Sequence, residues 1–172
     1  IKIGLGYDIH RLSRGKDLYL GGIKIPHPSG LLGHSDGDCL VHALIDALLG
    51  AAGEPDIGRL FPDTDPEYGG IRSTQLLREV IYRLRRRRIQ ILNADVVVAA
   101  QAPKLAPYIE AMKDTLCPLL GVDRDGLGIK AKTNEGLGLI GRERKRVGEG
   151  QSGERGGRRS LKNKRAGGGG GG

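Results

Sequence analysis

The sequence predicts an α/β fold, an α+β two-layer sandwich in which helices pack on one face of a mixed four-stranded sheet. Three observations predict it. Short alternating segments occur near the N-terminus, long runs with helical periodicity follow them, and β-branched or alternating segments return in the second half. Strands and helices interleave along the chain as they do in layered folds. The 172 residues suffice for one well-cored domain.

The first expected strand covers residues 2–10, where apolar residues alternate with small or polar ones. Gly4 and Gly6 in this segment indicate that another backbone comes close. Because the side chains of a strand alternate between its two faces, Asp8 and His10 are expected to share one face.

Residues 39–52 form the first expected helix. Apolar residues cover nearly its whole circumference, so the helix should be buried. His42 lies within it, and a polar histidine on a buried helix needs a partner. The oxygen acceptors that helix starts prefer precede it as Ser35, Asp36 and Asp38.

The remaining expected elements follow from similar patterns. They are a short strand over 18–25 that bends at two glycines, a turn-rich loop over 56–66, a helix that Ser73 caps and four arginines end at 85–88, a strand over 89–100, a helix that begins at Pro107, and a strand over 127–133.

Charge is distributed unevenly along the chain. The formal net charge is +8, but nine Lys/Arg against three Glu in residues 143–172 account for +6, which leaves +2 for residues 1–142. We therefore expect a nearly neutral domain over 1–142. Residues 143–172 form a basic tail, rich in Gly and Arg, that has too few apolar residues to form a core. Its composition is that of a disordered segment or of an artefact such as a shifted reading frame.

Several classes of protein are disfavoured by the sequence. Cys39 and Cys117 are far apart and follow no CxxC pattern, so neither a disulfide framework nor a zinc-thiolate site is predicted. No run approaches the ~20 apolar residues of a membrane-spanning helix, and no signal-peptide pattern opens the chain. We expect a protein that is not secreted, cytoplasmic in a bacterium or plastid in a eukaryote, without a membrane partner.

Asp8, His10 and His42 together offer three oxygen and nitrogen ligands, one fewer than a closed tetrahedron. Such a set suits a catalytic Zn²⁺ or similar divalent ion whose fourth position is left for substrate. Each histidine taken alone is more often an ordinary hydrogen-bonded residue, but their grouping with carboxylates favours the metal site. His34 is not needed for a helix cap. Because a helix N-terminus favours phosphate, it is a candidate for contacting a phosphoryl group.

Residues 130–136 lie at the end of the last expected strand and carry cationic and hydroxyl donors beside a carboxylate. A site for phosphate with Mg²⁺ would require such groups. From this motif alone, a strand end with solvated charges is the more frequent explanation. The arginines at 85–88 are most simply a solvated helix end, favourably placed against the helix dipole.

Six motifs occur in order along residues 1–142. They are Gly6–His10, Leu32–Asp38, Asp56–Gly58, Leu60–Asp65, Gln101–Lys104 and Lys130–Glu135. Together they closely resemble the 2-C-methyl-D-erythritol 2,4-cyclodiphosphate synthases. The resemblance implies an enzyme of non-mevalonate isoprenoid biosynthesis, a phosphorus-oxygen lyase. It would convert 4-diphosphocytidyl-2-C-methyl-D-erythritol 2-phosphate into the cyclic diphosphate and release CMP.

The resemblance also implies a mechanism and two metal ions. The substrate's own 2-phosphate attacks the β-phosphorus, so the protein contributes positioning and charge neutralisation rather than a nucleophile. Asp8, His10 and His42 would hold a Zn²⁺ or similar ion that polarises the β-phosphate. Glu135 would hold a Mg²⁺ or Mn²⁺ that bridges the α- and β-phosphates of the substrate.

By the same resemblance, His34 and Thr133 are the catalytic residues that stabilise the transition state. The methylerythritol phosphate would lie against Ser35 and the loop over 56–65, while cytidine would lie in the backbone of 100–106. The implied substrate-binding residues are Asp8, Ile9, His10, His34, Ser35, Asp56, Ile57, Gly58, Phe61, Pro62, Asp63, Thr64, Asp65, Ala100, Gln101, Ala102, Pro103, Lys104, Leu105, Ala106, Lys132, Thr133, Asn134, Glu135, Leu139 and Arg142.

The resemblance further implies a homotrimer with active sites between subunits. Two departures from the family pattern stand out. Lys132 and Asn134 occupy positions where many members have threonine, and the final apolar strand that follows Arg142 in the family is absent here. Two alternatives carry less weight. They are a metal-dependent phosphohydrolase that uses water as nucleophile, and RNA binding through the basic tail, which has no aromatic residue for base stacking.

Overall fold

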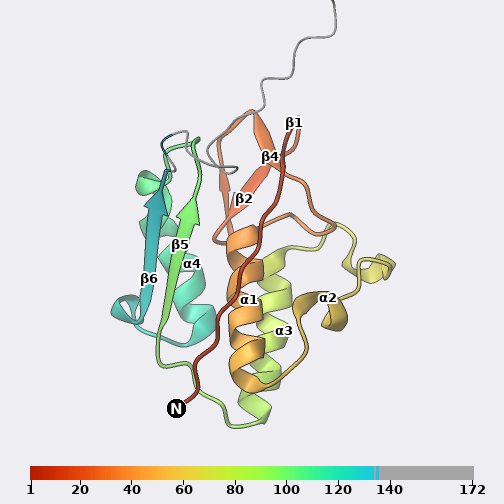
Figure 1. Cartoon of the computed structure of the whole chain (residues 1–172), viewed down its shortest axis with the longest axis vertical. Coiled ribbons are helices and arrows are strands. Elements are labelled where there is room, and N and C mark those ends of the chain that lie inside the picture. The colour runs from red at the N-terminus through yellow and green to blue at the C-terminus, as the bar shows by residue number, and fades with distance from the viewer. Residues whose placement is uncertain (134, 136–172) are drawn as a thin grey trace, which may run out of the picture.

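The structure, a computed structural model, describes residues 1–133 and 135. Its elements, in chain order (Figure 1), are β1 (Leu12–Arg14), β2 (Leu18–Leu20), β3 (Ile23–Ile25), β4 (Ser29–Leu31), α1 (Cys39–Ala52), α2 (Ile57–Leu60), the 3-10 turn η1 (Pro66–Tyr68), α3 (Ser73–Arg86), β5 (Ala94–Ala99), the 3-10 turn η2 (Ala106–Tyr108), α4 (Ile109–Leu120), the 3-10 turn η3 (Arg124–Gly126) and β6 (Leu127–Lys132).

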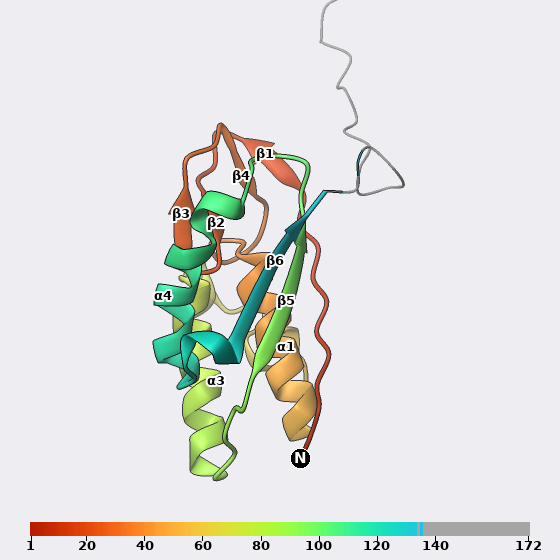
Figure 2. The same cartoon turned by 90° about the vertical axis from the view of Figure 1, so that its left-hand side faces the viewer.

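Helices α4 and α1 contact the parallel pair of strands β5 and β6. These strands pair from Ala94 opposite Leu127 to Ala99 opposite Lys132, and α4 makes the crossover that a parallel pair requires. The helices α1, α3 and α4 lie on one side of this pair (Figures 1 and 2). The core between them includes side chains with no exposed surface, such as Val41, Leu77 and Met112. The predicted mixed α/β fold is thus confirmed.

The predicted four-stranded sheet is not seen within the described residues. The described residues form three two-stranded sheets, β1 with β4, β2 with β3 and β5 with β6, where a single four-stranded sheet was expected. Residues 3–10 alternate between exposed and half-buried positions, but residues 2–10 pair with no strand in this part of the chain. The reason is physical, because alternation reports which face of a segment is covered and not which backbone lies beside it.

Other boundaries shift by smaller amounts. The strand expected over 89–100 is assigned only from Ala94, and Pro107 lies in the turn η2, so that α4 begins at Ile109. Cys39 and Cys117 are both free thiols. None of the helices between residues 1 and 133 is long and apolar enough to cross a membrane.

The extended segment over residues 1–10 packs directly on α1 (Figure 1). A Cβ atom at Gly4 would lie 1.8 Å from the Ala47 carbonyl oxygen, and one at Gly6 would lie 1.9 Å from that of Ala43. Only glycine allows so close an approach. The close backbone contact predicted from these two glycines is therefore confirmed, and the partner backbone is α1.

Asp38 ties the start of α1 to the hairpin of β2 and β3. Its side chain caps α1 by accepting from Val41 N at 3.1 Å, and it also accepts from Gly21 N at 2.9 Å and Gly22 N at 2.6 Å. These two glycines have φ of +62° and +81°, as a tight two-residue hairpin turn requires. Asp38 is fully buried, and this burial raises the pKa of its carboxyl group, although three N–H donors oppose the shift.

We predict that Asp38→Asn lowers the free energy of unfolding at neutral pH by about 2 to 3 kcal/mol. A carboxamide has one oxygen acceptor, so its NH₂ group must face a backbone N–H. This loss outweighs the relief of burying a charge. Urea unfolding followed by circular dichroism measures the change. Asp123→Asn is the control, because Asp123 is exposed and makes no cap bond. It should shift stability by less than about 0.5 kcal/mol. Equal stability of the two variants would contradict the anchoring role of Asp38.

Candidate functional site

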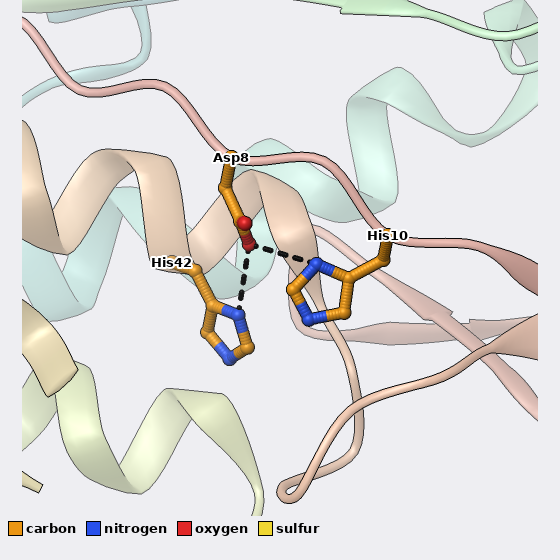
Figure 3. Close-up of side chains that lie close together, drawn as sticks. All are labelled: Asp8, His10 and His42. Carbon is orange, nitrogen blue, oxygen red and sulfur yellow. Dashed lines mark hydrogen bonds and ion pairs between the residues drawn. The ribbon is translucent and has the colours of Figure 1, made fainter. Parts of the chain in front are cut away.

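Three potential metal ligands come together where the N-terminal segment runs along α1 (Figures 1 and 3). Asp8 and His10 come from the segment and His42 from the helix. Asp8 Oδ2 lies 3.0 Å from His10 Nδ1 and 3.0 Å from His42 Nδ1. One ligand atom from each residue lies within 4.8 Å of the others. The grouping of these three residues that the sequence predicted is confirmed.

The electrostatics of this group favour a cation. Burial disfavours the charged form of Asp8, but hydrogen bonds and charge interactions with His10 and His42 outweigh it and hold the pKa of the Asp8 carboxyl group well below its usual value. The adjacent Asp8 carboxylate raises the pKa of His10, against the effect of burial. Asp8 therefore supplies a fixed negative charge beside two imidazole rings.

His10 Nδ1 provides a test of whether a metal ion fits here. This atom is buried and, within the described residues, makes no hydrogen bond of acceptable geometry, although it lies 3.0 Å from Asp8 Oδ2. Buried polar atoms nearly always have a partner. His10 Nδ1 therefore needs a further partner, and a metal ion would be one. One carboxylate oxygen and two imidazole nitrogens are the ligands that Zn²⁺ and similar ions take in catalytic sites. The group fits a divalent ion.

We predict that the affinity of this group for Zn²⁺ or Co²⁺ falls as the pH is lowered from about 8 to about 6. The metal binds the neutral imidazole. Because the pKa of His10 is raised from its usual value of 6.5, protons already compete with the metal for His10 somewhat above pH 6.5. Affinity should fall by up to about tenfold per pH unit below that pKa, while Asp8 stays ionised. Titration against a competing chelator measures this dependence. An affinity independent of pH would contradict it.

Behind His42 lies a buried polar cluster that the sequence did not predict. Ser73 was expected to cap α3, but this is wrong, because the cap position is Arg72 and Ser73 is the first helical residue. The Ser73 hydroxyl instead donates to Asp36 Oδ1 and lies 2.9 Å from His42 Nε2. Ser35 Oγ, a predicted substrate contact, lies 3.0 Å from the same nitrogen. A serine before an apolar helical run has a cap as its ordinary role, so the sequence held no signal for this one.

The loop after α1 carries several predicted substrate residues. Asp56 caps α2 by accepting from Arg59 N at 3.0 Å, and Asp46 on α1 accepts from Ile57 N at 2.8 Å, which fixes α2 to α1. Asp56 and Asp46 line a cavity of about 260 Å³ together with Leu5 from the N-terminal segment. Gly58 is exposed in α2. This loop thus faces the same segment that carries Asp8.

Residues 61–65 continue the loop. Phe61 is buried and packs edge-on against Tyr68, with ring centroids 5.3 Å apart. Pro62, Asp63 and Thr64 are exposed, while the half-buried Asp65 caps the turn η1. His34 has an exposed side chain, and its carbonyl oxygen accepts from Gly70 N at 2.9 Å. The backbone of His34 is therefore held at the far end of this loop.

A second set of predicted residues lies at the carboxyl ends of β5 and β6. Ala100 N donates to Lys132 O at 3.0 Å, so the segment over 100–106 leaves β5 beside the residues that follow β6. Lys104, Lys132, Thr133 and Glu135 are all exposed there. Within 100–106, Leu105 is buried, and Gln101 and Pro103 are half-buried. Three other predicted residues lie outside the described part of the chain, namely Asn134, Leu139 and Arg142, as does the predicted boundary at 142.

Comparison with known proteins gives a consistent result. The YgbB family matches residues 1–148. A 2-C-methyl-D-erythritol 2,4-cyclodiphosphate synthase from Caldicellulosiruptor bescii is 52% identical over 142 residues, which cover 83% of this chain and 90% of that protein. A bifunctional IspD/IspF enzyme from Desulforudis audaxviator is 54% identical over 141 residues, or 82% of this chain and 36% of the longer protein.

Solved structures agree with the sequence relatives. A structure of a 2C-methyl-D-erythritol-2,4-cyclodiphosphate synthase, described as a bound form with CDP, has a TM-score of 0.75 and 49% sequence identity. It covers 78% of this chain and 90% of that one. These matches confirm the resemblance drawn from the six motifs, and the relatives' names confirm the prediction of an enzyme.

Proposed function

The chain belongs to the YgbB family, and on this premise we propose that it converts 4-diphosphocytidyl-2-C-methyl-D-erythritol 2-phosphate into 2-C-methyl-D-erythritol 2,4-cyclodiphosphate and CMP. This is the cyclodiphosphate synthase reaction of isoprenoid biosynthesis, after which the relatives are named. The observation that carries the proposal is the grouping of Asp8, His10 and His42, whose ligand atoms lie within 4.8 Å of one another, in a chain that the family matches over residues 1–148.

The reaction requires one bond to form and one to break. An oxygen of the substrate's 2-phosphate attacks the β-phosphorus, and the bond from that phosphorus to the bridging oxygen breaks, so CMP leaves with that oxygen. Both groups are anionic, so the main barrier is charge repulsion, and catalysis consists of positioning and electrostatic stabilisation. A divalent ion held by Asp8, His10 and His42 would supply Lewis-acid stabilisation of a phosphate oxygen.

The chain's own residues would do the positioning. Ser35 lies beside His42 and would contact the phosphate near the ligand group. Asp56, in the cavity against the N-terminal segment, would accept hydrogen bonds from the polyol. His34 and Thr133 would donate to phosphate oxygens as charge builds up in the transition state.

The nucleotide would bind at the carboxyl ends of β5 and β6. The relative described with CDP supports a cytidine diphosphate ligand. We place its base in the segment over 100–106, with Lys104 and Lys132 near the phosphates, since both cations are exposed at this edge. Glu135, which follows β6, would hold a Mg²⁺ or Mn²⁺ together with the diphosphate, because such ions take carboxylate and phosphate oxygens.

We predict that the Zn²⁺- and Mg²⁺-supplied protein yields CMP and a cyclic diphosphate, detected by ³¹P NMR as two phosphorus signals coupled through a shared oxygen. Attack by water would instead give a linear bisphosphate without that coupling, and so contradict the proposal.

His42→Ala should lower kcat/KM by roughly 100- to 1,000-fold, because several kcal/mol of charge stabilisation are lost. His27→Ala is the matched control and should retain activity, since the hydrogen bonds of the His27 side chain within the described residues are to Ser29, in its own turn.

We also propose that the chain assembles as a homotrimer in which a larger, four-stranded sheet is completed. Two features support this. The outer face of the N-terminal segment is an apolar row, in which Ile3 and Leu5 are each 92% exposed. Contiguous exposed apolar surface marks interfaces. In addition, β5 pairs on one edge only within the described residues, and open edges invite pairing.

We predict a trimeric mass for the protein in sedimentation or light scattering at micromolar concentration. The double variant Ile3→Asp, Leu5→Asp should sediment as a monomer, because each substitution would bury an unpaired charge. Tyr82→Asp, at an exposed apolar position on α3 away from this segment, should leave the mass unchanged. A monomeric parent protein would rule out the trimer.

A further inference from the structure

A chain of polar contacts runs behind His42, on the side away from Asp8. Arg72 Nε donates to Asp36 Oδ2 at 2.9 Å, the Ser73 hydroxyl donates to Asp36 Oδ1, and Ser73 Oγ lies 2.9 Å from His42 Nε2. Ser73 has no exposed surface, and only 4% of the Asp36 side chain is exposed. Neither residue belongs to the ligand group or to the predicted substrate contacts.

The direction of each hydrogen bond follows from counting protons. Asp36 is paired with Arg72 and, as a carboxylate, can only accept. The single hydroxyl proton of Ser73 is therefore used toward Asp36, so Ser73 Oγ can only accept from His42. On this side of the ring a hydrogen on His42 Nε2 is favoured, because a lone pair there would face the Ser73 lone pairs. On the other side the Asp8 carboxylate favours a hydrogen on Nδ1 until a metal ion takes that position.

A hydrogen on Nε2 leaves a lone pair on His42 Nδ1. That atom is 3.0 Å from Asp8 Oδ2, on the side where the ligand atoms converge. Ser35 Oγ lies 3.0 Å from Nε2 and 3.3 Å from Ser73 Oγ. With its own proton directed to Ser73 Oγ, it can share the His42 hydrogen as a second acceptor. The lone pairs of Nδ1 and of the Asp8 carboxylate then converge on one place, where a shared proton or a metal ion satisfies both.

We propose that Ser73 and Asp36 are positioning residues that hold His42 as its Nε2–H tautomer and present Nδ1 to the metal ion. The inference rests on the proposed metal-dependent function and extends it to residues outside the ligand group. Partners of this kind, which orient a ligating histidine through its other nitrogen, typically change metal affinity by about 10- to 100-fold when mutated.

Two variants of different chemistry test this relay, by which we mean the contacts that run from Asp36 through Ser73 to His42. Ser73→Ala removes the acceptor at Nε2, and since Ser73 makes no cap bond, it removes no helix cap. Asp36→Asn keeps the shape of the side chain but replaces one acceptor oxygen with an NH₂ donor. Arg72 is held in place by Gly22 O at 2.9 Å and stacks on Tyr19 at 4.0 Å, so it draws the amide oxygen to itself. Asp38 N, which donates to Asp36 Oδ1 at 3.3 Å, favours an oxygen at the other position. We expect the shorter, charged contact with Arg72 to outweigh it.

The NH₂ group of Asp36→Asn then faces Ser73 and turns the Ser73 hydroxyl proton toward His42. The preferred tautomer is thereby inverted to Nδ1–H, which blocks the metal-binding nitrogen. This inversion is a result that a merely structural role for Asp36 would not produce.

The experiment uses the full chain with ¹⁵N-labelled histidine and zinc as the only probe. Chelator competition should show that both variants bind Zn²⁺ about 10- to 100-fold more weakly than the parent. Long-range ¹H–¹⁵N spectra of the zinc-free protein at about pH 8 should show a larger fraction of the Nε2–H tautomer of His42 in the parent than in Ser73→Ala, and mainly Nδ1–H in Asp36→Asn, because Asp8 favours a hydrogen on Nδ1 in all three proteins. Ser13→Ala, a half-buried serine on β1, is the control and should match the parent.

Unchanged zinc affinity, or weaker binding with an unchanged His42 tautomer, would overturn the relay. Both readouts are independent of turnover. A parent protein that binds zinc in this way but makes no cyclic diphosphate would therefore refute the proposed reaction and leave the relay standing.

Discussion

The contact between the N-terminal segment and α1 determines where the ligand group can form. Gly4 and Gly6 lie so close to the carbonyl oxygens of Ala47 and Ala43 that a Cβ atom at either glycine would come within 2 Å of an oxygen. Because residues of an extended segment alternate in direction, the face that carries these glycines also carries Asp8 and His10. His42 immediately precedes Ala43 on the helix. The same packing that buries the glycines therefore brings the carboxylate against both imidazoles.

Two buried carboxylates on either side of Gly37 connect this group to the rest of the fold. Asp38 holds the hairpin turn of β2 and β3 to the start of α1, and Asp36 holds the start of α3 through Ser73 and Arg72. Each carboxylate oxygen has at least one donor, so the cost of burying charge is offset by charge-assisted hydrogen bonds. A buried polar network of this kind specifies one geometry only when it is fully satisfied. Three elements thus converge on the surroundings of His42.

Much of this arrangement could be predicted from local patterns in the sequence. The bounds of α1 and the shared face of Asp8 and His10 follow from periodicity. The bend at the two glycines was also predicted, but the single strand expected over 18–25 is a hairpin of β2 and β3. The role of Ser73 could not be predicted, because its partner Asp36 lies 37 positions away along the chain and only the packing of α3 against α1 brings them together. The prediction of a paired strand over residues 2–10 was wrong within the described residues for a related reason. Periodicity indicates which side chains are covered but does not indicate which backbone lies beside them. The substrate roles of the exposed residues after β5 and β6 depend on a ligand, so they remain predictions.

The ligand group joins two parts of the molecule that are held to different degrees. His42 belongs to a buried helix anchored at its start, whereas Asp8 and His10 belong to a segment with one face on α1 and its apolar face exposed. A metal ion bound by all three would restrict the segment, so part of its binding free energy would be spent on ordering that backbone. Covering the apolar row by a neighbouring subunit would restrict the same segment in advance. If the proposed trimer uses this surface, metal binding and assembly must therefore strengthen each other by equal factors, since the linkage between two binding equilibria is reciprocal.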